Sequence, residues 1–149
     1  MEPTKVTRGN GHLEAYLAKL RANKANQLIS NDLRQGRLLD IGCGFGEFGK
    51  FLLKRYEKVD YTGIDIVPEF IEVAKKEVSG GKFLTSDFNK LDHRYDVVIA
   101  SGVLNSNKGG RNLEYRKKSI KKMFDLTKDV FAFNMLGGHP QPKGNPKSN

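Results

Sequence analysis

Three glycines, Gly42, Gly44 and Gly46, follow a short apolar run in residues 38–47, LLDIGCGFGE. Glycine has no Cβ and tolerates positive φ, so a turn built from it lets a ligand approach the backbone closely. When such a turn joins a strand to a helix, it lies at the carboxyl edge of a parallel sheet, where α/β folds bind ligands. We therefore predict that Gly42, Cys43, Gly44 and Gly46 contribute to a cofactor site.

The acidic residues beside this turn bear on the class of ligand. Residues 44–49, GFGEFG, also match the dinucleotide pattern G-x-G-x-x-G, which is a weak signal alone. A pyrophosphate prefers backbone N–H groups and the positive end of a helix, whereas Asp40 and Glu47 would place negative charge near it. A ligand with a sulfonium and an ammonium group and no phosphate has the opposite preference. S-Adenosylmethionine is such a ligand, so the pattern favours it over NAD.

A further acidic residue, Asp65, closes the next apolar run after the turn. It follows Gly46 by about 20 residues, which is the spacing typical of the acidic residue that binds the ribose in nucleotide-binding α/β folds. We expect its carboxylate to accept hydrogen bonds from both ribose hydroxyls and Ile66 to pack on the adenine. The alternative role, a cap of the helix that begins near Pro68, is compatible with the first.

Two more strand ends carry polar or small residues. Ser86, Asp87 and Phe88 follow the third expected strand. Asp87 is predicted to accept a hydrogen bond from the adenine amino group and Phe88 to border the ring; an aspartate that only stabilises a turn is the alternative. After the fourth strand, the backbone of Ser101 and Gly102 would line the methionine part of the ligand.

Strand and helix patterns alternate along the chain, which predicts a mostly parallel five-stranded sheet with helices on both faces. One domain over residues 1–137 is expected, with residues 138–149 as a disordered tail. The N-terminal part divides into a loose segment, 1–10, and an amphipathic helix, 11–30. The expected strands are 37–41, 58–65, 82–85, 95–100 and 129–135, and the other helices are 47–55, 68–79 and 112–127.

These motifs, in this order, resemble those of class I S-adenosylmethionine-dependent methyltransferases. The resemblance covers about residues 37–136 and implies a Rossmann-like three-layer α/β/α sandwich. The cofactor would be S-adenosyl-L-methionine and its product S-adenosyl-L-homocysteine. The segments that carry the resemblance are 39–46 (LDIGCGFG), 62–65 (TGID), 86–88 (SDF) and 95–104 (YDVVIASGVL).

The resemblance also implies roles for single residues. Asp40 would lie near the methionine amino group, and the glycines of residues 42–46 would wrap the ligand. Asp65 would hold the ribose, and Asp87 with Phe88 the adenine.

The chain departs from the family pattern at two places. Many relatives that act on small molecules have a histidine after the segment matching Val103 and Leu104, where this chain has Asn105 and Ser106. We therefore assign no general base. Family members also usually add an antiparallel C-terminal strand pair, which we expect to be lacking here. The fifth strand would then be an exposed edge, covered in a homodimer or left open in a minimal member.

Composition sets the remaining expectations. The chain has 26 basic and 17 acidic residues and a net charge of +9, with many basic residues in 111–122. This run attracts RNA or an anionic substrate, or it is a solvated helix face. No apolar run approaches the ~18 residues of a membrane span, and the single cysteine fits a reducing compartment, so we expect a cytoplasmic protein without membrane contact. His12, His93 and His139 lack metal-ligand spacing, so no metal is expected.

The sequence therefore predicts a methyltransferase that acts on a small-molecule acceptor. The sulfonium is an activated donor, so the protein mainly aligns the acceptor and the methyl group in a dry pocket. Three alternatives remain open: an RNA methyltransferase that uses the basic surface, a non-catalytic S-adenosylmethionine-binding module, and an NAD-dependent oxidoreductase.

Overall fold

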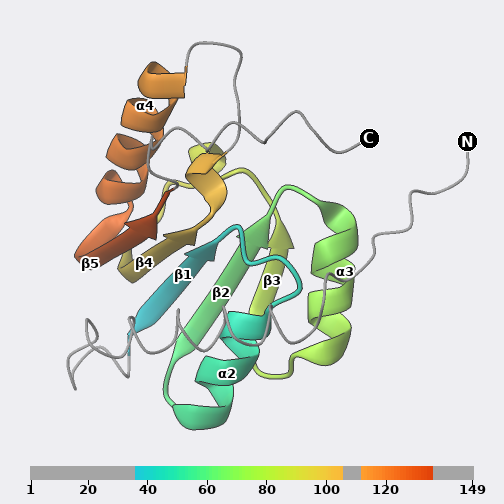
Figure 1. Cartoon of the computed structure of the whole chain (residues 1–149). Coiled ribbons are helices and arrows are strands. Elements are labelled where there is room, and N and C mark those ends of the chain that lie inside the picture. Colours follow the sequence, from blue (N-terminus) through green and yellow to red (C-terminus); the bar gives the residue numbers. More distant parts are fainter. Residues whose placement is uncertain (1–35, 106–111, 136–149) are drawn as a thin grey trace, which may run out of the picture.

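The computed structural model describes residues 36–105 and 112–135, and the helix expected over 11–30 and the tail expected over 138–149 lie outside these ranges. The described residues form five strands, three α-helices and two 3₁₀ turns (Figure 1). In chain order these are β1 (Arg37–Ile41), α2 (Glu47–Arg55), β2 (Asp60–Asp65), α3 (Pro68–Glu77), β3 (Lys82–Thr85), η2 (Phe88–Lys90), β4 (Tyr95–Ser101), η3 (Val103–Asn105), α4 (Asn112–Asp125) and β5 (Thr127–Asn134).

The five strands form one sheet in the order β3-β2-β1-β4-β5, and every neighbouring pair is parallel. The chain moves from β1 outward to β3 and then returns to the other side of β1. Ile41, the last residue of β1, pairs with Ile64 of β2 and with Ala100 of β4. The carboxyl end of β1 is thus the point where the strand order reverses, and open α/β sheets bind ligands in the crevice at this point.

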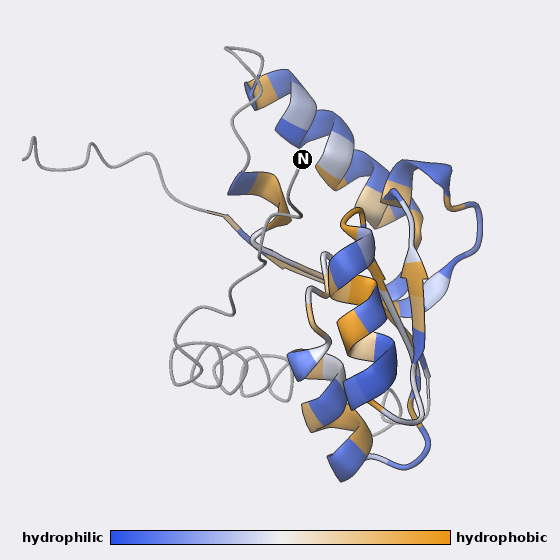
Figure 2. Ribbon diagram, turned by 90° about the vertical axis from the view of Figure 1, so that its right-hand side faces the viewer, coloured by the Kyte–Doolittle hydropathy of each residue, from blue (hydrophilic) through white to orange (hydrophobic). Residues whose placement is uncertain are grey.

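Helices cover both faces of the sheet, and each face has its own apolar core (Figure 1). Leu52 of α2 and Ile71 of α3 are fully buried in one core, and Met123 of α4 is fully buried in the other. Figure 2 shows mostly hydrophilic residues along α4, as expected for a helix that buries a narrow stripe. The Rossmann-like three-layer α/β/α prediction is therefore confirmed.

The last strand begins earlier than the sequence predicts. Residues 112–127 were expected to be helical, but α4 ends at Asp125 and β5 starts at Thr127. The Thr127 hydroxyl donates to the Met123 carbonyl (2.8 Å), while the Tyr95 N–H donates to the Leu126 carbonyl (2.8 Å). These bonds join the helix end to the sheet and leave Leu126 as the one residue between α4 and β5. β4 is the one neighbour of β5 among the described strands, and a second copy on its outer edge stays a prediction.

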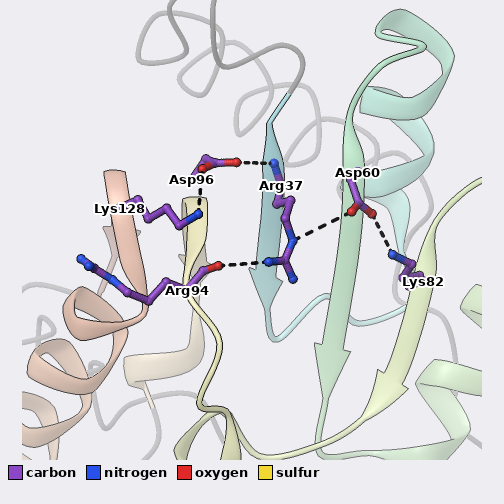
Figure 3. A network of polar contacts seen from close by, with 6 residues as sticks. All are labelled: Arg37, Asp60, Lys82, Arg94, Asp96 and Lys128. Carbon is purple, nitrogen blue, oxygen red and sulfur yellow. Dashed lines mark hydrogen bonds and ion pairs between the residues drawn. The ribbon is translucent and has the colours of Figure 1, made fainter.

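The amino-terminal edge of the sheet, opposite the glycine turn, carries ion pairs and hydrogen bonds between charged residues (Figure 3). Asp60 accepts from the Lys82 ammonium at 3.1 Å, and Asp96 accepts the Arg37 backbone N–H at 2.7 Å. The charged side chains of the Asp60 pair are about half exposed, and pairs of this kind contribute little to stability. They are useful as controls for substitutions at the opposite edge. Among the described helices, none is long and apolar enough to cross a bilayer.

Candidate cofactor site

The glycine turn is bound to the neighbouring strand by backbone hydrogen bonds. The N–H groups of Gly42 and Cys43 both donate to the Ile64 carbonyl, at 2.8 and 3.0 Å, and the Gly46 N–H donates to the Cys43 carbonyl at 3.0 Å. Gly42, Gly44 and Gly46 have φ values of 72°, 56° and 81°. Residues other than glycine rarely adopt these φ values, so the backbone conformation explains why glycine stands at all three positions.

Contacts distinguish the glycines further. A Cβ on Gly42 would lie 2.6 Å from Cγ2 of Val103, so the turn and η3 approach closely only because Gly42 is a glycine. A Cβ on Gly46 would meet the Phe83 ring at 2.9 Å, and Gly46 is also the N-cap of α2. A Cβ on Gly44 would meet nothing within 4 Å. Among these three glycines, Gly42 is therefore the one where an added Cβ would meet a neighbouring atom at the shortest distance.

Asp65 is the residue that joins the turn to α3. One carboxylate oxygen accepts the Gly44 N–H at 3.0 Å, and the other accepts the Val67 N–H, also at 3.0 Å. Val67 is the N-cap of α3, and no side chain caps the first turn of this helix, so Asp65 orders the turn that leads into α3 and does not cap the helix itself. Each carboxylate oxygen has two acceptor positions. The described bonds therefore leave Asp65 with acceptor capacity for both hydroxyls of a ribose.

A cavity of about 460 Å³ lies over the carboxyl ends of the strands. Eight of the predicted cofactor residues line it. Among its described lining residues, Asp65 and Asp87 are the acidic side chains, and no lysine or arginine contributes. The lining consists of Ile41, Gly42, Ile64, Asp65, Ile66, Val67, Ser86, Asp87, Phe88, Asn89, Ser101, Gly102, Val103 and Tyr115.

The β3 end of the cavity is a tight turn. Asp87 accepts both the backbone N–H and the side-chain amide of Asn89 on the same oxygen, each at 2.9 Å. Asp87 therefore stabilises a turn, as the alternative interpretation expects, and it also lines the cavity. The Ser86 N–H donates to the Asp65 carbonyl at 3.0 Å, and Phe88 is a lining residue that is otherwise buried.

The β4 end is held by a residue that sequence reasoning missed. The Gly102 N–H donates to the side-chain oxygen of Asn134 at 2.8 Å, and the Asn134 amide donates to the Ser101 hydroxyl at 2.9 Å. Asn134 ends β5, so its place beside β4 depends on a strand pairing that spans 32 residues of sequence. The asparagine itself gave no local signal.

Four predicted cofactor residues, Asp40, Cys43, Gly44 and Gly46, are not among the lining residues of the cavity. Asp40 is buried and accepts a hydrogen bond from the Tyr61 hydroxyl at 2.6 Å. Burial raises the pKa of the Cys43 thiol far above its ordinary value, and the carboxylates of Asp40 and Asp65 raise it further. Cys43 is therefore an uncharged packing residue, in keeping with the sequence interpretation.

Tyr115 is the lining residue that comes from the basic helix α4. From the sequence, the basic run in residues 111–122 is expected to attract RNA or an anionic substrate, or to be a solvated helix face. Two of its cations instead hold loops near the cavity: Arg116 donates to the Leu104 carbonyl at 3.0 Å, and Lys122 donates to the Leu91 carbonyl at 2.7 Å. Ser119 and Met123, four residues apart on the same helix, are its buried residues, and this spacing identifies the face of α4 that packs on the sheet.

No group of three or more potential metal ligands occurs within residues 36–105 and 112–135. Of the three histidines, His93 alone is described, and it lies beside Asp92 on the surface. The expectation that the protein binds no metal stays a prediction.

Comparisons with known proteins agree with this fold. A family model described as a methyltransferase domain matches residues 39–129. The chain is 33% identical over 140 residues to a malonyl-[acyl-carrier protein] O-methyltransferase of Acetivibrio thermocellus, covering 88% of this chain and 47% of that protein. It is 30% identical over 84 residues to a ribosomal RNA small subunit methyltransferase C of Actinobacillus pleuropneumoniae, covering 53% of this chain and 24% of that protein. The chain thus spans less than half the length of either relative.

A solved structure has the same fold. The plantazolicin methyltransferase BpumL, in complex with a pentazolic desmethylPZN analog and SAH, superimposes with a TM-score of 0.67 at 20% identity. The superposition covers 81% of this chain and 48% of BpumL.

Proposed function

Because the chain belongs to the family of methyltransferase domains, we propose that it binds S-adenosylmethionine in the cavity and transfers the methyl group to a small-molecule acceptor. The charge of the cavity wall is the observation that carries the proposal. The chain has a net charge of +9, yet the described lining contains two carboxylates and no basic side chain. A cationic ligand without phosphate fits such a wall, whereas a dinucleotide would be repelled.

The acceptors and apolar surfaces of the wall support one placement of the ligand. Asp65 offers its remaining lone pairs to the ribose hydroxyls. Ile66 is 73% exposed at the rim, and the adenine ring would cover it. The adenine would then lie toward Asp87 and Phe88, and the methionine part would cross Gly42 toward the β4 end.

The chain's own contribution to the reaction is alignment. S-Adenosylmethionine, when bound, supplies a methyl group that its sulfonium has already activated. Gly42 and Val103 lie close together in the cavity wall, since a Cβ on Gly42 would meet Cγ2 of Val103 at 2.6 Å. Tyr115 of α4 lines the cavity as well. An acceptor that is already anionic, such as a carboxylate, needs no general base in this arrangement.

A transfer assay tests the proposal. The chain would be incubated with methyl-labelled S-adenosylmethionine and, in parallel, with a malonyl thioester, a set of small carboxylic acids, and ribosomal RNA. The malonyl thioester is included because a relative is named for that acceptor. We expect label in a small molecule, with little dependence on salt. Label in RNA that is lost as salt rises supports the RNA alternative, and cofactor binding without transfer supports the binding-module alternative.

A further inference from the structure

The carboxyl ends of β4 and β5 meet in a small polar cluster of Ser101, Gly102 and Asn134. Ser101 and Asn134 end their strands and are partners in the parallel pairing. The Gly102 N–H donates to Oδ1 of Asn134 at 2.8 Å, and Nδ2 of Asn134 donates to the Ser101 hydroxyl at 2.9 Å. Ser101 and Gly102 line the cavity, whereas Asn134 is not among its lining residues. Asn134 therefore acts on the cavity wall without being part of it.

The backbone fixes the orientation of the Asn134 amide. A backbone N–H can only donate, so the atom that faces Gly102 must be the amide oxygen. The amide nitrogen then faces Ser101, and it too can only donate. Because the Ser101 oxygen accepts this hydrogen bond, the proton of the same hydroxyl must point elsewhere. The Gly102 N–H thus sets, through Asn134, the direction of the Ser101 hydroxyl.

The Ser101 hydroxyl is a donor that the protein does not use within residues 36–105 and 112–135. Among these residues it accepts from Asn134 and donates to no protein acceptor. The other serine of the cavity wall, Ser86, differs, because its hydroxyl donates to the Asp87 carbonyl at 3.3 Å. Ser101 is partly exposed and lines the cavity, so its proton is available to a molecule bound there.

The surroundings of this hydroxyl suit an anionic partner. The acidic residues of the wall, Asp65 and Asp87, follow β2 and β3, which lie on the other side of β1 from β4. A hydroxyl binds an ionised acceptor more strongly than a neutral one. A carboxylate has two oxygens, so one can accept from Ser101 while the other stays free to attack the methyl group. A neutral amine has one lone pair, which the hydrogen bond from Ser101 would occupy.

We propose that the methyl acceptor presents a carboxylate to the Ser101 hydroxyl and that Asn134 is the positioning residue that directs this hydroxyl toward it. The inference rests on the proposed function, because the methyl group must lie at the β4 end of the cavity. Transfer forms a bond between the free carboxylate oxygen and the methyl carbon, breaks the bond from that carbon to sulfur and leaves the electron pair on sulfur. The product is a methyl ester, and no proton moves, so no general base is required.

The test uses binding, with sinefungin in place of the cofactor and malonate as the carboxylate probe. Sinefungin carries an ammonium group where the sulfonium would be and transfers no methyl group. In an NMR titration of the sinefungin-loaded chain, Ser101→Ala should lower the malonate affinity about tenfold, the low end of the range for a hydrogen bond to a charged group. Asn134→Ala should lower it about threefold, because the hydroxyl can then take three staggered positions.

Asn134→Asp reverses the direction of the hydroxyl. One carboxylate oxygen still accepts the Gly102 N–H, but the other faces Ser101 and takes its proton. The malonate affinity should therefore fall by at least about tenfold. The fall should be smaller in the Ser101→Ala background, where only the added charge acts, and Asn134→Ala should have no further effect there. Asp129→Ala, which removes an exposed carboxylate elsewhere on β5, is the control and should change either affinity less than about twofold.

Sinefungin binding reports whether each variant keeps the site, and its affinity should fall less than the malonate affinity in both Asn134 variants. Equal losses for the two ligands would show a purely structural role and overturn the inference. It is also overturned if Asn134→Asp costs the same affinity with and without Ser101, or if wild type binds sinefungin but not malonate. If wild type does not bind sinefungin, the proposed function itself fails.

Discussion

Asp65→Ala is the substitution whose consequences follow most directly from the site. The carboxylate accepts the N–H groups of Gly44 and Val67 and, in the proposed complex, the ribose hydroxyls. A hydrogen bond to a charged group contributes about 1.5–3 kcal/mol. Losing the ribose contact should therefore weaken cofactor binding about 10-fold to 150-fold, at about 1.4 kcal/mol for each factor of ten.

The same substitution should destabilise the free protein only modestly. Both backbone N–H groups are partly exposed, so water replaces the lost acceptor and the free energy of unfolding falls by about 1 kcal/mol. Calorimetric titration with S-adenosylhomocysteine measures the first effect, and urea denaturation without ligand measures the second. Asp60→Ala, which removes a carboxylate from the other end of β2, should leave the affinity unchanged.

The reasoning would be refuted by a folded Asp65→Ala variant with wild-type affinity, since Asp65 would then not contact the ribose. Asp65→Asn is a second test of the contact between Asp65 and the ribose. Asparagine can still accept the Val67 N–H, but its amide would face the Gly44 N–H donor. Its affinity should therefore also fall, and full retention of affinity would contradict the placement.

Three further predictions concern the turn and α4. Gly42→Ala should lower S-adenosylhomocysteine affinity by at least about tenfold, because the new Cβ would lie 2.6 Å from Cγ2 of Val103 at a φ of 72°; unchanged affinity in calorimetry would contradict the described contact. Because burial raises the Cys43 pKa, the thiolate is scarce, and alkylation of the folded chain by iodoacetamide should not accelerate between about pH 7 and 9, whereas the unfolded chain should follow an ordinary thiol. Arg116→Ala should lower the free energy of unfolding in urea by about 1–2 kcal/mol, and the exposed Lys117→Ala by less than about 0.5 kcal/mol; equal losses would show that the Arg116 bond is not structural.

The order of the elements was predictable because it is a local property of the chain. The apolar run of β1, the glycines after it and the proline that begins α3 each act through the backbone of their own neighbourhood. The sequence predicts a later start for β5 because Thr127 is a polar residue. In the structure its hydroxyl donates to the Met123 carbonyl of the preceding helix, so Thr127 can begin the strand.

The site was predictable only in part, for reasons of topology. Residues at strand ends, such as Asp65 and Ser101, follow from the parallel sheet alone. Tyr115 and Asn134 reach the site through helix packing and strand pairing across the sheet, which no short motif records. Asp40 precedes the glycine turn, but its carboxylate is buried and accepts from the Tyr61 hydroxyl of the neighbouring strand, a partner that no short motif records.

The central claim is that the cavity prefers a positively charged sulfur compound to a phosphorylated nucleotide. Calorimetric titration of one preparation with S-adenosylmethionine, S-adenosylhomocysteine and NAD tests it most directly. The structure predicts that the first two ligands saturate one site per chain and that NAD gives no binding heat. Tight binding of NAD, with no response to either adenosyl sulfur compound, would contradict it.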